Sequence, residues 1–107
     1  MVYVPSASLS SVGVAREYCV RVSGGRTVTR KFCPVCGAPV LLSASVWPNI
    51  VGVWAGSLDD PSWFKPQAAS WVSSAQPWDI LSPVVRQFHQ GPDLEFLVQC
   101  QMPAGQA

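Results

Sequence analysis

Hydrophobic and polar residues alternate in two neighbouring stretches in the first third of the chain. Residues 16–22 alternate between apolar side chains and polar or charged ones, and residues 27–32 repeat the alternation. A period of two residues is typical of a strand with one buried face. The Ser-Gly-Gly sequence at residues 23–25 is a strong turn signal between the two stretches. The pattern therefore predicts a β-hairpin over residues 16–32.

Other parts of the chain predict further short strands, because apolar stretches lie there between turn signals. These stretches cover residues 2–4, 40–42, 50–54, 69–72 and 94–100. Proline suits the first position of a helix, so we expect a single helical turn over residues 83–88. Turns are expected around residues 47–49 and 59–61, where Pro, Asn and Asp occur. The chain has no strand–helix–strand repeat, and the predicted fold class is all-β with short strands.

The composition fits one small folded domain spanning residues 1–107. Of the 107 residues, 49% are hydrophobic and 12% are charged, which is too apolar for a disordered chain. We expect residues 101–107 to form a frayed tail. No apolar run approaches the roughly 18 residues of a membrane span, and the start does not resemble a signal peptide. One close cysteine pair without a wider disulfide framework favours a cytoplasmic protein.

Charge is unevenly distributed along the chain. The first 36 residues hold one acidic residue, Glu17, against five basic ones: Arg16, Arg21, Arg26, Arg30 and Lys31. A basic stretch of this kind could attract an anionic ligand, or it could be the solvated face of a strand. The asymmetry is mild and no recognition motif accompanies it, so it does not predict a nucleic-acid partner.

The sharpest local motif is the Cys-Pro-Val-Cys-Gly sequence from Cys33 to Gly37. Two thiolates separated by two residues can bind one tetrahedral zinc, and Gly37 suits the tight turn that this requires. A structural zinc needs four ligands, so Cys33 and Cys36 form half of a site. Three interpretations stay open: a metal-free or oxidised pair, zinc bound within one chain, and zinc shared between two chains. The remaining soft ligands, Cys19, His89 and Cys100, lack a metal-binding spacing.

Four segments together resemble a known family. They are Val2-Tyr3-Val4-Pro5, the stretch from Arg30 to Val40, Ala55-Gly56-Ser57-Leu58-Asp59-Asp60-Pro61, and Gln76-Pro77-Trp78-Asp79. In this order, over about residues 2–88, they resemble the glutathione-dependent formaldehyde-activating enzymes, also called the centromere-protein-V-like family. The resemblance implies an all-β, Mss4-like fold derived from a zinc ribbon. It also implies descent from carbon–sulfur lyases that join formaldehyde to glutathione as S-hydroxymethylglutathione.

The chain departs from the family's zinc-binding pattern. In the family, an early Cys-x-Cys pair completes a structural zinc with the later Cys-x-x-Cys, and a Cys-x-Cys-x-x-Cys stretch holds a catalytic zinc. Neither early motif occurs in this sequence, and Cys33 and Cys36 correspond to the later pair. We therefore expect a domain that is incomplete at its N-terminus and has no catalytic residues of its own.

An incomplete sheet would leave an open edge and an uncovered apolar face, which favour association with another chain. We therefore expect a homodimer, and a non-catalytic remnant of the lyase fold that binds a small ligand or a protein. One alternative is a lyase of the parent class completed by another chain or by a missing N-terminal segment. A second alternative is a zinc-ribbon-like nucleic-acid binder.

A small thiol or anionic ligand such as glutathione is the ligand class that the resemblance implies. Arg30 could bind its carboxylate, and the Trp63 and Trp78 rings could stack on it. The plainer interpretation is a solvated arginine and two core tryptophans. Asp59 and Asp60 are interpreted as a turn and His89 as a surface residue.

Overall fold

The computed structural model describes residues 1–99, in which two compact units can be distinguished. The first unit comprises Met1–Ser62, and the second begins at Trp63. The predicted frayed tail at residues 101–107 lies outside the described residues.

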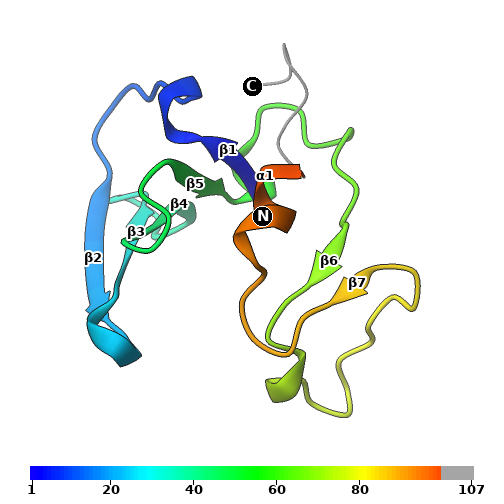
Figure 1. Ribbon diagram of the computed structural model, residues 1–107. Helices are drawn as coiled ribbons and strands as arrows, with labels where there is room; N and C mark the ends of the chain where they lie inside the picture. Colours follow the sequence, from blue (N-terminus) through cyan, green and yellow to red (C-terminus); the bar gives the residue numbers. More distant parts are fainter. Residues whose placement is uncertain (100–107) are drawn as a thin grey trace. The chain divides into compact units, whose positions relative to one another are not determined.

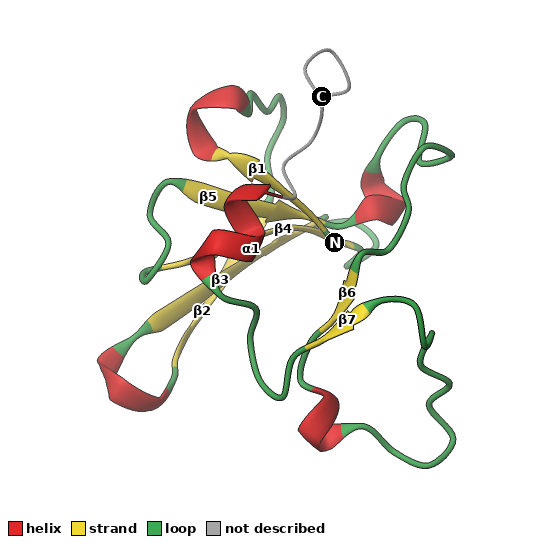
Figure 2. Cartoon of the chain, turned by 45° about the vertical axis from the view of Figure 1, so that its right-hand side comes forward, coloured by secondary structure: helices red, strands yellow, loops and turns green. Residues whose placement is uncertain are grey.

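The first unit is a five-stranded antiparallel sheet with the strand order β1-β5-β4-β3-β2 (Figures 1 and 2). Strands β2 to β5 follow one another as a meander, whereas β1 joins the sheet on the far side of β5. All five were predicted from the sequence, and the all-β class is confirmed. The strands are β1 (Val2–Pro5), β2 (Arg16–Arg21), β3 (Thr27–Phe32), β4 (Pro39–Ala44) and β5 (Ile50–Val53).

The buried side chains of this unit gather at one end of the sheet, in β1 and β5. The register places Val2 opposite Val53 and Val4 opposite Val51, and all four are at least 92% buried. Directly opposed residues share a face of the sheet, so these four valines form one continuous apolar layer.

On the other face of β5, a glycine leaves room for neighbouring side chains to pack against the strand. Gly52 lies opposite Tyr3 in the register, and a Cβ at this position would overlap the Met1 thioether and contact the Tyr3 ring. The absence of a side chain lets Met1 and Tyr3 lie directly over the β5 backbone. Burial there raises the pKa of the Tyr3 hydroxyl.

The predicted hairpin over residues 16–32 is confirmed, and its turn explains the Ser-Gly-Gly sequence. Gly24 and Gly25 have φ angles of 79° and 75°, a left-handed conformation that only glycine adopts without steric cost. The Val22 amide donates to the Arg26 carbonyl at 2.8 Å and closes the hairpin.

The second unit contains a short parallel pair, β6 (Ala68–Ala69) and β7 (Arg86–Gln87), and the helix α1 (Leu94–Gln99). Three sequence predictions need correction here. The strand expected over residues 69–72 is shorter and ends at Ala69. The segment expected to be a helical turn, 83–88, contains β7, and the strand expected over 94–100 is α1 over its described residues.

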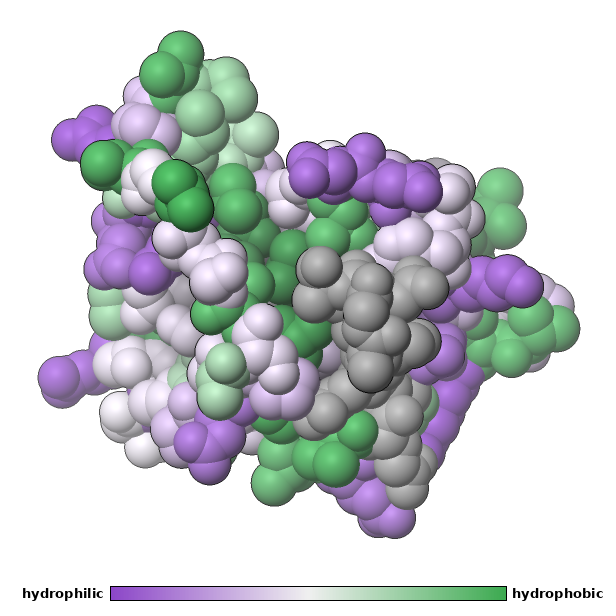
Figure 3. Space-filling model, turned by 90° about the horizontal axis from the view of Figure 1, so that it is seen from above, coloured by the Kyte–Doolittle hydropathy of each residue, from purple (hydrophilic) through white to green (hydrophobic). Residues whose placement is uncertain are grey.

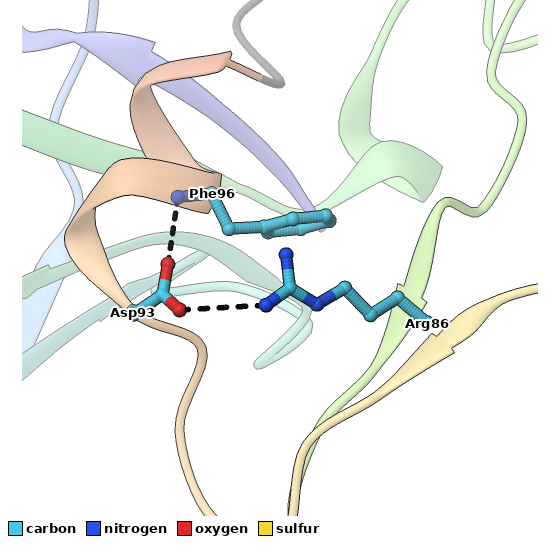
Figure 4. A network of polar contacts seen from close by, with 3 residues as sticks. All are labelled: Arg86, Asp93 and Phe96. Carbon is cyan, nitrogen blue, oxygen red and sulfur yellow. Dashed lines mark hydrogen bonds and ion pairs between the residues drawn. The ribbon is translucent and has the colours of Figure 1, made fainter.

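Helix α1 forms because its first turn is capped. The Asp93 carboxylate accepts a hydrogen bond from the Phe96 amide at 2.8 Å, in the manner of an N-cap, and lies 3.7 Å from the Arg86 guanidinium (Figure 4). A cap satisfies an amide that has no partner within the helix. The apolar stretch from Leu94 suggested a strand, but the cap that Asp93 provides favours a helix.

Strand β7 forms because its amides find partners in a neighbouring segment. The Arg86 amide donates to the Gln67 carbonyl at 3.2 Å, and the Phe88 amide donates to the Ala69 carbonyl at 2.9 Å. The Arg86 guanidinium also lies 4.7 Å from the centre of the Phe88 ring and 5.6 Å from that of Phe96. These cation–π contacts favour the extended backbone over the helical turn that Pro83 suggested.

Large apolar side chains remain exposed in both units, and Figure 3 shows hydrophobic atoms (green) at the surface among hydrophilic ones. Those of the first unit are Val12, Val14, Tyr18, Val22, Val35 and Val46. Within residues 1–99, no helix is long and apolar enough to cross a membrane.

Candidate ligand and metal sites

The Cys-Pro-Val-Cys-Gly motif is the loop that joins β3 to β4. The Cys33 amide donates to the Ala38 carbonyl at 2.9 Å, and the Gly37 amide donates to the Cys33 carbonyl at 2.9 Å. Gly37 has a φ of 76°, as its place in the motif predicts. The loop is therefore a tight knuckle held at both ends by backbone hydrogen bonds.

The knuckle favours a thiolate at Cys33. The backbone amide of Cys36, followed by those of Val35 and Gly37 and the Cys36 thiol, stabilises the Cys33 sulfur and lowers its pKa. Both thiols are free; Cys33 is half-buried and Cys36 is exposed. Amide donors around a sulfur are what a metal-binding knuckle supplies, since the thiolate is the form that binds metal.

The donor set at this loop fits half of a zinc site. Structural zinc takes four ligands in a tetrahedron, and the knuckle supplies Cys33 and Cys36. Across the described residues, no three His, Cys, Asp or Glu side chains come close enough together to hold a metal. The third described cysteine, Cys19, lies at the middle of β2 and is exposed.

A cavity of about 170 Å³ lies on the face of the sheet that carries the side chain of Lys31. The sheet register places Lys31 opposite Leu41 and Ser43 opposite Val51, so these four residues share one face. The segment that follows β1 supplies the rest of the lining. The cavity is lined by Ser6, Leu9, Ser11, Lys31, Leu41, Ser43 and Val51.

Lys31 is the charged group of this cavity. Its ammonium lies 3.3 Å from the Glu17 carboxylate on β2, and the two side chains are 40% and 58% exposed. An ion pair as exposed as this one is weak and exchanges readily with other partners. The cavity therefore combines an accessible cation, three serine hydroxyls and an apolar wall.

The predicted ligand residues are placed elsewhere. Arg30 is exposed and lies opposite Tyr18 and Leu42, on the face of the sheet away from Lys31. Trp63 and Trp78 belong to the second unit. None of the three lines the cavity of Lys31.

The two tryptophans also differ from each other. Trp63 is half-buried, with its ring centre 6.4 Å from that of Phe64. Trp78 is 78% exposed, so its interpretation as a core residue is wrong. It lies in a turn in which the Gln76 amide donates to the Asp79 carboxylate at 2.9 Å.

Sequence reasoning missed the cavity of Lys31 because its lining comes from four separate segments. One signal was available: in an alternating strand over residues 27–32, Arg30 and Lys31 must point to opposite faces. The sequence does not indicate which face of the sheet carries a cavity, because that depends on the path of the segment after β1.

The Asp-Asp-Pro sequence is a turn, in agreement with its interpretation. The Asp60 carboxylate accepts hydrogen bonds from the Ser62 hydroxyl at 2.6 Å and from the Ser62 amide at 3.0 Å, and these lower its pKa. His89 is exposed, as predicted for a surface residue.

The architecture defines an all-β domain in which two strands of an antiparallel sheet are joined by a cysteine knuckle. A model of the family described as glutathione-dependent formaldehyde-activating enzyme matches residues 1–74. The chain belongs to this family, whose fold is Mss4-like. The match includes the knuckle and the cavity of Lys31, and it ends before the turn at residues 76–79. No significant match was found among curated proteins or among solved structures.

Proposed function

We propose that this protein is a non-catalytic, homodimeric member of the formaldehyde-activating family that binds a small anionic ligand, such as a carboxylate of glutathione, in the cavity of Lys31. The observation that carries the proposal is an accessible ammonium group in a hollow with three serine hydroxyls and an apolar wall.

The absence of catalysis is proposed from the cysteines. The resemblance implies lyase chemistry at a zinc held by Cys-x-Cys-x-x-Cys, and the four cysteines, at positions 19, 33, 36 and 100, contain no such spacing. A zinc ion lowers the pKa of a bound thiol or water and polarises a carbonyl. Neither Lys31 nor the serines of the cavity can supply these effects.

The ligand class is proposed from the size and charge of the cavity. Pockets that enclose a whole drug-sized ligand measure about 300–1,000 Å³, and this cavity is smaller, at about 170 Å³. It suits one carboxylate end of a peptide-like ligand, whose remainder would extend over the surface. A ligand carboxylate in the hollow would replace Glu17 as the partner of Lys31, because the exposed ion pair between Lys31 and Glu17 is weak.

Calorimetric titration with reduced glutathione tests the proposal. Lys31→Gln should weaken binding by about tenfold, as expected for the loss of one charge-assisted contact. Lys65→Gln is the matched control, because Lys65 is exposed and lies in the second unit. Equal affinities for the wild type and Lys31→Gln, or no binding at all, would reject the ligand site.

The parent lyase activity is a second candidate function, favoured by the knuckle that lowers the pKa of the Cys33 thiol. Incubation of the zinc-supplemented protein with formaldehyde and glutathione, followed by NMR, separates the two functions. We expect S-hydroxymethylglutathione to form at the uncatalysed rate. A clear acceleration that Cys33→Ser abolishes would replace the non-catalytic proposal by the lyase.

A further inference from the structure

The outer edge of β2 is the longest unpaired edge in the sheet. β2 has six residues, five of them exposed, and it is the last strand in the order (Figure 1). Among the described residues, no strand pairs with this edge. An open edge of this length is a template for pairing with another chain.

The backbone groups available at this edge can be assigned. The Val22 amide donates to Arg26 on the β3 side of the hairpin. Successive residues of a strand direct their N–H and C=O groups to opposite sides. The even-numbered residues of β2 therefore bond to β3, and Glu17, Cys19 and Arg21 present their N–H and C=O groups outward.

The opposite edge of the same sheet is blunted. The Ser6 amide donates to the Asn49 carbonyl, next to β5, so Tyr3 and Pro5 are the outward residues of β1. Proline has no N–H to offer, and β1 has only four residues. Of the two outer strands of the sheet, β2 therefore offers a partner strand more backbone N–H and C=O groups for hydrogen bonding than β1 does.

From these features we infer that a second copy of this chain pairs with β2, antiparallel, about a two-fold axis at Cys19. The pairing joins two five-stranded sheets into one continuous sheet. Outward residues must face outward residues, so Glu17 lies opposite the partner's Arg21, and Arg21 lies opposite the partner's Glu17. Both charges of each outer edge are then paired with opposite charges, which favours this register.

The neighbouring registers lose this complementarity. An axis at Tyr18 or at Val20 leaves neither charge opposite its counterpart. An axis at Glu17 or at Arg21 places two like charges directly against each other, which is destabilising. Charge complementarity therefore selects the axis at Cys19.

The other face of the pair is apolar. Tyr18 is 64% exposed and Val20 is half-buried, and in this register each Tyr18 lies opposite the partner's Val20. These are the close, non-hydrogen-bonded positions of an antiparallel pair. An aromatic ring against a β-branched side chain is a favourable cross-strand pair, and it covers the exposed Tyr18.

The pairing also changes the surroundings of the cavity. Glu17, Lys31 and Leu41 share one face of the sheet, and the partner's Arg21 arrives on that same face. Glu17 then has a second cationic partner, so Lys31 is freer to bind an anion. This interface rests on the proposed function, because it presupposes the homodimer proposed there. It adds which strands of the two chains pair.

One interpretation of the cysteine knuckle is incompatible with this interface. Phe32 lies opposite Arg16, three residues from the axis, so the two knuckles lie roughly 20 Å apart along the strands. A shared zinc holds its sulfurs at about 2.3 Å. The β2 pairing therefore excludes a zinc shared between the two knuckles of the same dimer.

The test uses charge reversal on the full-length chain, with mass measured by sedimentation or native mass spectrometry at micromolar concentration. Glu17→Arg and Arg21→Glu each place two like-charge pairs at the interface. Each should raise the dimer dissociation constant about tenfold or more. An equimolar mixture of the two variants restores two opposite-charge pairs and should form heterodimers. Circular dichroism of each variant verifies that it is folded.

Mild oxidation provides a second, independent readout. Opposed residues of a hydrogen-bonded pair have Cα atoms about 5.5 Å apart, within the range of a disulfide. Cys19 should therefore form a disulfide with the partner's Cys19, detected as a linked peptide under non-reducing conditions. Cys19→Ser should remove this species and leave the dimer mass unchanged.

The outcomes separate this interface from the proposed function. A dimer that neither charge variant weakens, and that lacks the Cys19 link, overturns the β2 interface but leaves the homodimer standing. A wild-type monomer overturns both the interface and the homodimer. Glutathione binding that depends on Lys31 is measured separately and supports the ligand site in either case.

Discussion

The two ends of the five-stranded sheet differ in how their strands are stabilised. At the β1–β5 end, every residue of β5 is buried, and four opposed valines form a continuous layer. At the β2 end, Val20 is half-buried and the other five residues of the strand are exposed. This strand is held by its hydrogen bonds to β3 and by one exposed ion pair. The stability of the sheet therefore comes from one end, and its capacity for recognition lies at the other.

The largest difference is expected from matched valine truncations. Val51→Ala should lower the free energy of unfolding by about 2 kcal/mol, because it leaves a cavity in the buried layer. Val20→Ala should cost less than about 1 kcal/mol, since its side chain already contacts water. Urea denaturation in the Arg21→Glu background removes the contribution of pairing between copies. Equal costs at the two positions would contradict the comparison.

A second test enlarges a side chain where the sheet is most tightly packed. Gly52→Ala places a methyl group against Met1 and Tyr3 and should cost about 1–3 kcal/mol, the low end applying if the flexible Met1 moves aside. Gly56→Ala is the control, because apart from its two chain neighbours no residue has a heavy atom within 4 Å of the added methyl group. Thermal melts of the two variants should differ by several degrees, and overlapping melts would argue against close packing at β5.

Hydrogen exchange sharpens the comparison amide by amide. The β5 amides should exchange most slowly, because they lie between two strands in the buried part of the sheet. In β2, the amides of Glu17, Cys19 and Arg21 should exchange rapidly in dilute protein and slow as the concentration rises. The amides of Tyr18 and Val20 bond to β3 and should change less. Concentration-independent exchange of all five would contradict pairing at this edge.

The smallest expected effect concerns the pH dependence of the knuckle. The folded-state pKa of Cys33 is lowered by backbone amides. The thiolate therefore adds stability above the unfolded-state pKa, and this is lost as the pH falls through the folded-state pKa. Alkylation of Cys33, followed by peptide mass spectrometry, should reach half its maximal rate below pH 9.0, the ordinary thiol value from which its pKa is lowered. A midpoint at or above that value would show that the amides do not act on this sulfur.

Some of the fold and the site was predictable because it depends on residues close together in the chain. The hairpin follows from alternation around two glycines in left-handed conformation, and the knuckle follows from Cys33, Cys36 and Gly37. The turn at Asp60 follows from a carboxylate two residues before Ser62. In each case the stabilising hydrogen bond spans only a few residues, so local chemistry determines the conformation.

The second unit shows where local reasoning failed. An apolar stretch predicted a strand at residues 94–100, but Asp93 caps a helix there, and the ion pair with Arg86 reinforces it. Pro83 suggested a helical turn, but the amides of Arg86 and Phe88 bond to a segment about 20 residues earlier. Short segments with weak propensity adopt whichever conformation their tertiary partners satisfy.

The sequence by itself determined the family, the strands of the sheet and the two knuckle cysteines, because these depend on motifs and on a two-residue period. Tertiary structure alone decided that β1 joins β5, that Lys31 rather than Arg30 lines a cavity, and that β2 is left as an open edge. These features depend on which distant segments pack together. The pairing of distant segments is set by the burial of whole apolar faces. Alternation along the sequence gives a strand such a face, but it does not determine which other segment covers it.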